Sequence, residues 1–157
     1  MGNFKLTSSA FSDGGEIPRE CGYKNGNKIP PLTISGIPEG TESLALIMDD
    51  PDAMGAVGKV WVHWVVWNID PWEKGSTKFT IILNNRTLGN SLQGMTDFGE
   101  VGYGGPAPPY KRHTYVFKLY ALDTKLDLPD KSTKADVEKA MEGHIIEQAT
   151  LEGTYAP

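Results

Sequence analysis

Hydrophobic residues along the chain fall mainly in short runs that predict β-strands. Residues 44–48 form a continuous apolar run that ends at acidic residues and a proline, as expected of a strand buried on both faces. Residues 60–69 are richer in β-branched and aromatic side chains, which predicts a central strand covered on each side. With a regular two-residue period, the face of this strand that carries His63 would also carry Trp61, Val65 and Trp67.

Two further segments have the composition of strands, residues 79–83 and residues 113–122. In the second, the two-residue period places His113, Tyr115 and Phe117 on one face.

Residues 134–149 have a helical pattern instead. Thr133 is a good N-cap, and Asp136 stands three residues on, which approximates a capping box. An apolar stripe at helical spacing would pack on a sheet, and it consists of Val137, Ala140, Met141, His144 and Ile145. We therefore expect His144 to be a semi-buried packing residue.

These elements predict one mostly β domain over residues 1–157, with antiparallel strands and a peripheral helix near the C-terminus. The net charge of −5 argues against bulk nucleic-acid binding and against adhesion to an anionic membrane. The single cysteine, Cys21, excludes an intrachain disulfide, and we expect a buried structural thiol. The first residues lack the pattern of a signal peptide, and no apolar run approaches membrane-spanning length. A soluble, cytoplasmic protein is the expectation.

Acidic residues follow the first buried run, with Asp49, Asp50 and Asp52 placed around Pro51. They could form only a solvated turn, since Asp and Pro are common turn residues. His63 favours a different interpretation, because the thirteen residues after Asp50 could return the chain beside the strand it left. A carboxylate facing this imidazole would raise the His63 pKa and orient one ring nitrogen, leaving the other to donate to a ligand.

His63 could instead be a satisfied core histidine. Its neighbours Trp61 and Trp67 favour a pocket wall, because small-molecule sites combine aromatic surfaces with a few convergent polar groups.

A turn rich in glycine and proline, residues 102–109, precedes the strand that begins at His113. Its three glycines would allow positive φ and close approach to a ligand, while its prolines fix the chain and remove N–H groups. The remaining N–H groups, such as those of Gly105 and Ala107, could point together into an anion-binding concavity. With His113 and Tyr115 on the adjoining strand, the pattern predicts a small polar ligand site.

Nucleotide-binding, hydrolytic and metal-dependent alternatives have less support. The glycine-rich turn lacks the third glycine of a dinucleotide loop and opens into prolines. Residues 89–94 miss the spacing of a nucleophile elbow by one residue. Asp50, Asp52, His63 and His113 could in principle bind a divalent metal, but their spacing matches no compact metal motif. We predict neither a cofactor nor a bound metal.

Four short motifs follow one another in a distinctive order. They are Asp50-Pro51-Asp52-Ala53, Val62-His63-Trp64-Val65-Val66-Trp67-Asn68, the turn at residues 102–109, and His113-Thr114-Tyr115. This order resembles the signature of the phosphatidylethanolamine-binding protein family, particularly its short bacterial and archaeal branch of Raf-kinase-inhibitor-like proteins. The resemblance extends from Phe4 to Tyr155.

The resemblance implies a large antiparallel β-sheet packed on a smaller sheet, with a peripheral helix. It also implies a pocket for phosphate, sulfate or carboxylate groups, including phospholipid head groups. Carried onto this chain, the ligand-binding residues would be Asp50, Asp52, His63, Gly105, Ala107, Pro108, His113 and Tyr115. No nucleophile is evident among them, so we expect binding rather than turnover.

The chain departs from the family pattern at three places. Met54 stands where a proline is usual, and only residues 110–112 separate the last proline of the turn from His113. Thr114 replaces a common arginine, and Lys111 or Arg112 could supply the missing cation.

The sequence thus predicts a non-catalytic cytoplasmic protein that binds a small anionic or phosphorylated ligand, with a regulatory role left open. One alternative is a protein-interaction module that inhibits a kinase or protease through the same pocket. Another is a weak hydrolase or metal-dependent enzyme that uses Asp50 and His63 as its base. We also expect a homodimer, as in similar short relatives, and no nucleic-acid partner or integral membrane contact.

Overall fold

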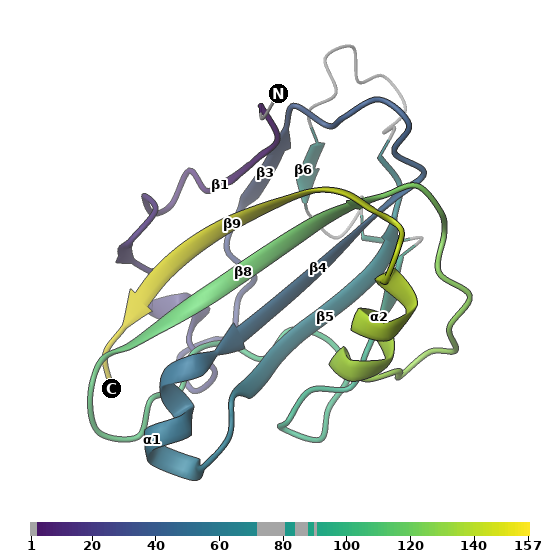
Figure 1. Cartoon of the computed structure of the whole chain (residues 1–157). Helices are drawn as coiled ribbons and strands as arrows, with labels where there is room; N and C mark the ends of the chain where they lie inside the picture. The colour runs from purple at the N-terminus through teal and green to yellow at the C-terminus, as the bar shows by residue number, and fades with distance from the viewer. Residues whose placement is uncertain (1–2, 72–80, 84–87, 90) are drawn as a thin grey trace.

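The computed structural model describes residues 3–71, 81–83, 88–89 and 91–157, and the strands among them form two sheets (Figure 1). The large sheet has the order β2 (Gly15–Glu16), β9 (Ile145–Tyr155), β8 (His113–Leu122), β4 (Ser43–Asp50), β5 (Trp61–Ile69) and β7 (Leu92–Gln93). The small sheet has the order β1 (Lys5–Thr7), β3 (Leu32–Ser35) and β6 (Ile81–Leu83). Pairing is antiparallel except between β2 and β9. The predicted architecture is confirmed.

Short helical segments complete the described chain. They are the 3₁₀ turns Arg19–Cys21 and Pro51–Ala53, α1 (Met54–Val57) and α2 (Lys134–Met141). No helix among the described residues is long and apolar enough to span a membrane.

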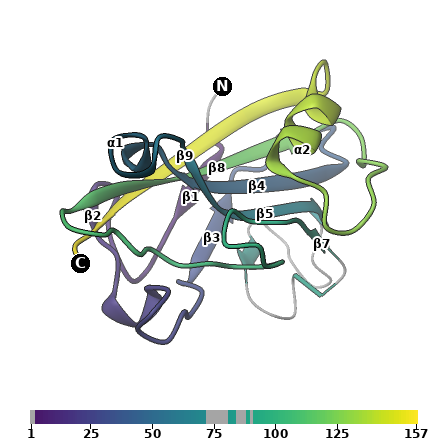
Figure 2. The same ribbon diagram turned by 90° about the horizontal axis from the view of Figure 1, so that it is seen from below.

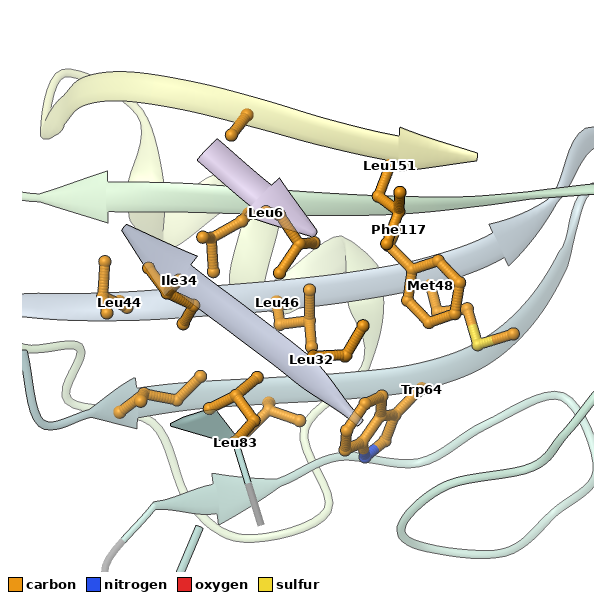
Figure 3. Packing of buried hydrophobic residues seen from close by; sticks show 14 of the residues in the cluster. Leu6, Leu32, Ile34, Leu44, Leu46, Met48, Trp64, Leu83, Phe117 and Leu151 are labelled. Carbon is orange, nitrogen blue, oxygen red and sulfur yellow. The ribbon is translucent and has the colours of Figure 1, made fainter. Parts of the chain in front are cut away.

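The main hydrophobic core lies between the two sheets (Figure 3). The small sheet contributes Leu6, Leu32, Ile34 and Leu83, and the large sheet contributes Leu44, Leu46, Met48, Trp64, Phe117 and Leu151. Full burial of each large apolar side chain contributes about 1.5–3 kcal/mol, so this layer holds the large sheet in place.

α2 lies on the face of the large sheet away from the small sheet (Figure 2). A second hydrophobic core packs beneath it. It includes Ala45 and Ile47 of β4 and Val65 and Trp67 of β5, packed with Val137 and Met141 of α2. Every residue of β4 is buried. The prediction of a strand buried on both faces is therefore confirmed for β4. β5 is covered on both faces as predicted, but it is not central, since only the two-residue β7 lies outside it in the sheet.

Two of the predicted elements differ in extent from the structure. The strand expected at residues 79–83 is confirmed at Ile81–Leu83, and residues 79–80 lie outside the described residues. The β4 strand runs to Asp50, so Asp49 and Asp50 belong to the strand itself. Because consecutive strand residues point to opposite faces, these two carboxylates separate.

The prediction of a helix at residues 134–149 is confirmed only for its first half and is wrong after Met141. The capping box at Thr133 and Asp136 is present, but α2 ends at Met141. Gly143 then takes a left-handed φ of 79°, a conformation that ends helices and favours glycine. From Ile145 onward the chain pairs along β8 as β9, and this non-local ladder outweighs the local helical pattern.

His144 consequently is not the buried packing residue that the helical stripe predicted. It is exposed, and its Nδ1 lies 2.7 Å from Asp123 Oδ1. Ile145, the next member of the predicted stripe, is also 45% exposed.

A register shift in β5 changes the faces predicted for its side chains. Asp49 pairs with Val62 and Met48 pairs with Trp64, so His63 is an extra residue opposite β4, as in a β-bulge. His63 therefore lies on the same side as Trp64, facing the small-sheet side of the molecule. Val65 and Trp67 face the α2 side, and the prediction that they share the face of His63 is wrong.

Candidate functional site

The ends of β4 and β8 bring a buried carboxylate and a buried imidazole together. Asp50 and His113 are 3% and 1% exposed, and Asp50 Oδ2 lies 2.6 Å from His113 Nδ1. The other carboxylate oxygen accepts the backbone N–H of Asp52 at 2.9 Å. An ionised carboxylate only accepts hydrogen bonds, so His113 Nδ1 carries the hydrogen. The other nitrogen, His113 Nε2, is buried and has no hydrogen-bond partner among the described residues.

His63 is held by the glycine-rich turn rather than by an aspartate. Its Nδ1 lies 2.7 Å from the carbonyl oxygen of Gly104, which can only accept. The predicted Asp50–His63 pair is thus replaced by Asp50–His113, because the shift in β5 turns His63 toward the turn. The predicted rise in pKa is also wrong: burial lowers the pKa of His63, against smaller raising effects of the Gly104 carbonyl and Asp50.

Tyr115 supplies a second buried polar group without a partner. Its ring is edge-on to that of His63, with centroids 5.1 Å apart, so β8 places this residue beside His63. Its hydroxyl is buried and makes no hydrogen bond of standard geometry to the described residues, although it interacts with the Asp50 carboxylate and the Ala107 backbone. Burial and the nearby Asp50 charge raise the pKa of Tyr115, so the hydroxyl keeps its proton at neutral pH and can donate.

The glycine-rich turn is fixed by Asn27, a residue that the sequence pattern did not single out. Asn27 Oδ1 accepts the N–H of Gly105 at 2.7 Å, and its Nδ2 donates to the Tyr103 carbonyl at 3.1 Å. The Gly105 N–H, expected to face a ligand, is therefore already used. A side chain at this position would meet the Cys21 carbonyl oxygen at 1.9 Å, so glycine is required by close packing rather than by a positive φ.

Asp50, His63 and His113 border a small cavity of about 170 Å³, whereas Tyr115, which packs against the His63 ring, is not among the described residues that line it. It is lined by Asp50, Ala53, Ala56, Val57, Trp61, His63, Phe98, Ala107, Pro109 and His113. At about 30 Å³ per water molecule, this space suits a phosphate-sized group with a short substituent. Its walls are mostly apolar, and its polar side chains are Asp50, His63 and His113.

The remaining predicted site residues lie around this cavity rather than on its lining. Asp52 accepts the backbone N–H of Thr114 at 2.8 Å and so ties the 3₁₀ turn after β4 to β8. Pro108 lines a neighbouring cavity of about 340 Å³, which also contains Arg19 and Lys24. Trp67, expected as a pocket wall, packs in the core beneath α2.

Phe98 is a lining residue that sequence reasoning missed. It stacks on Tyr23 with centroids 4.0 Å apart and meets His63 edge-on at 5.3 Å. No periodic pattern marked it, because it lies in the irregular loop closed by the Met95–Val101 bridge.

Cations lie outside the cavity. Arg112, one of the two residues expected to replace a missing arginine, pairs with Glu16 instead. Asp49, on the opposite face of the sheet, pairs with Lys118 at 3.1 Å and Lys134 at 2.8 Å. Within the described residues, neither lysine nor arginine lines the cavity, so its donors must come from imidazole and phenol groups.

Other candidate chemistry has little geometric basis in this chain. A cavity of about 460 Å³ between β1 and β9 has, among the described residues, neither a histidine nor a buried unpaired polar atom in its lining. Cys21 is buried, as predicted, and burial raises the pKa of its thiol to about 11. The described residues hold no group of three or more His, Cys, Asp or Glu side chains arranged for a metal ion.

Comparison with known proteins extends over nearly the whole chain. The family model described as phosphatidylethanolamine-binding protein matches residues 7–156. A relative from Methanothermobacter thermautotrophicus, described only as a UPF0098 protein, is 46% identical over 150 residues, which cover 96% of this chain and 97% of the relative.

Solved structures agree with this assignment. A phosphatidylethanolamine-binding protein homologue from Chlamydia trachomatis has a TM-score of 0.81 at 37% identity and covers 97% of this chain and 96% of its own. Escherichia coli YbcL, described as a member of the mammalian family, has a TM-score of 0.82 at 32% identity and covers 98% of both chains. The chain therefore belongs to the phosphatidylethanolamine-binding protein family.

Proposed function

We propose that the cavity beside Asp50, His63 and His113 binds a small ligand through a phosphate or carboxylate group, without catalysing its conversion. The observation that carries this proposal is the pair of buried, unpaired polar atoms, His113 Nε2 and the Tyr115 hydroxyl. Buried polar groups normally have a partner, and leaving one unpaired costs about 1–3 kcal/mol. A bound oxyanion would satisfy the Tyr115 hydroxyl, and it would also satisfy His113 Nε2 when that ring carries both protons.

The surroundings suit this role. The Tyr115 hydroxyl donates to a ligand oxygen, and His113 Nε2 donates when its ring carries both protons. Trp61, Phe98 and Pro109 give the cavity an apolar wall, and a less polar surrounding strengthens each hydrogen bond to a charged oxygen. A phospholipid head group and a free phosphorylated metabolite share this chemistry.

Family membership supports a binding role, and a cytoplasmic setting accords with the single buried cysteine. The homodimer also stays a proposal, supported by exposed apolar residues near the mouth of the cavity, Met54 and Val57 on α1 and Tyr110 after the turn. Light scattering by the free protein would test it. A protein partner that inserts an acidic side chain into the cavity would be the alternative to a small ligand.

Calorimetry with O-phosphoethanolamine tests the proposal. We expect saturable binding by the parent protein and a roughly 3- to 10-fold weaker affinity for Tyr115→Phe, since a hydrogen bond contributes about 0.5–1.5 kcal/mol. His144→Gln, altered at an exposed histidine outside the site, should bind like the parent. Equal affinities for the parent and Tyr115→Phe would remove this cavity from consideration.

A further inference from the structure

We propose that His63 makes the cavity select phosphate monoesters over phosphodiesters and sulfate esters, because the nitrogen that it presents to the ligand accepts a hydrogen bond. This inference rests on the proposed function, namely that the cavity binds a phosphate group. It narrows the ligand to an oxyanion that brings its own proton.

The position of the hydrogen on His63 follows from its partner. The Gly104 carbonyl oxygen, 2.7 Å from Nδ1, can only accept, so Nδ1 carries the hydrogen of a neutral ring. His63 lines the cavity, and with Nδ1 used by the Gly104 carbonyl, Nε2 is the ring nitrogen left to meet a ligand there. In a neutral ring this nitrogen offers a lone pair.

The surroundings keep the His63 ring neutral. It is 2% exposed and faces Asp50 on β4, His113 and Tyr115 on β8, and the carbonyls of Gly104 and Gly105. Asp50, Asp49 and the carbonyls favour the protonated ring, but burial outweighs them and lowers the pKa of His63. No lysine or arginine among the described lining residues offsets an added negative charge.

Ligands differ in whether they can use this lone pair. A phosphate monoester has a second pKa of about 6, so near that pH much of it is a monoanion with a P–OH group. That hydroxyl can donate to His63 Nε2, while the other phosphate oxygens accept from the Tyr115 hydroxyl and, when its ring carries both protons, from His113 Nε2. A phosphodiester or a sulfate ester is also a monoanion but has no such hydrogen, so an oxygen lone pair would face the nitrogen lone pair.

The head group of an intact phospholipid is a phosphodiester. The geometry thus favours a soluble phosphate monoester over a lipid in a bilayer as the ligand. A site built to pair with a ligand hydroxyl discriminates strongly against an analogue without it, because its own polar group is left unpaired.

Three probes with the same aminoethyl group test this selection: O-phosphoethanolamine, 2-aminoethyl hydrogen sulfate, which matches it in size, and glycerophosphoethanolamine, which is a diester. By calorimetry at pH 6.0, we expect the monoester to bind at least about tenfold more tightly than either of the others. The sulfate ester should gain affinity as the pH falls to 5, because protonated His63 becomes a donor. His63→Gln should lose the discrimination, because an amide can accept or donate.

The outcomes separate the two claims. If the parent protein binds all three probes equally across this pH range, His63 does not select and the inference is wrong, while the anion pocket stands. If the folded parent binds none of them, the proposed function itself fails. If His63→Gln does not fold, nitrogen-15 NMR of the histidines in the parent protein still tests the proposal. A protonated His63 Nε2 at pH 6.0 in the free protein would overturn it.

Discussion

At the scale of single residues, the site depends on which oxygen each imidazole nitrogen contacts. Asp50 holds His113, and the Gly104 carbonyl holds His63, each through Nδ1. His113 Nε2 thereby has no hydrogen-bond partner among the described residues, and His63 has its Nε2 left for the cavity that it lines. The sequence predicted the residue types but paired Asp50 with the wrong histidine, because chain separation alone does not say where an extra strand residue falls.

The lowered pKa of His63 makes the stability of the fold dependent on pH. Its usual value is 6.5, and burial depresses it in the folded protein, so between the folded and unfolded pKa values only the unfolded chain binds the extra proton. The free energy of unfolding should therefore be unaffected by this group above pH 7. It should fall as the pH drops below 6.5, by up to about 1.4 kcal/mol per pH unit.

Urea unfolding from pH 5 to 8 measures this dependence in the absence of phosphate and sulfate. His63→Gln should show a weaker loss of stability at low pH than the parent, and His144→Gln should follow the parent curve. Parallel curves for the parent and His63→Gln would contradict the assignment of a neutral, buried His63.

At the scale of elements, local pattern and non-local pairing compete. Buried strands with apolar side chains on both faces, such as β4, are predicted well because burial itself sets their composition. The end of α2 was predicted wrongly, because Gly143 ends the helical segment and residues 145–155 pair with β8 as a strand. The register shift in β5 opposite Met48 and Asp49 likewise cannot be predicted from a two-residue hydrophobic pattern. It nevertheless decides which side chains border the cavity.

The turn at residues 102–109 makes a prediction of its own at this scale. Gly105→Ala would place a Cβ 1.9 Å from the Cys21 carbonyl oxygen, so the turn must shift away from both Cys21 and Asn27. We expect the free energy of unfolding, measured by urea unfolding, to fall by about 1–3 kcal/mol, the usual cost of overpacking. Gly55→Ala in α1 is the matched control, because a Cβ there meets nothing within 4 Å. A Gly105→Ala protein as stable as the Gly55→Ala protein would contradict this role of the turn.

At the scale of the whole molecule, two cores on opposite faces of the large sheet hold the site at one end of that sheet. The ends of β4 and β9, the start of β8 and α1 all lie there (Figure 1). The fold class was predictable because motif order is a property of the whole chain and the motifs occur in the family's order. The net charge of −5 for the whole chain does not predict the charge of the cavity. The cavity is mostly apolar, and its charge depends on three side chains, Asp50, His63 and His113.

The central claim is that a metal-free cavity between these side chains binds a phosphate group, and NMR of the three histidine rings tests it most directly. With chelator present, titration with O-phosphoethanolamine should shift the His63 and His113 ring resonances saturably and leave those of His144 unchanged. Shifts that appear only after zinc is added, or that affect all three rings equally, would contradict the account.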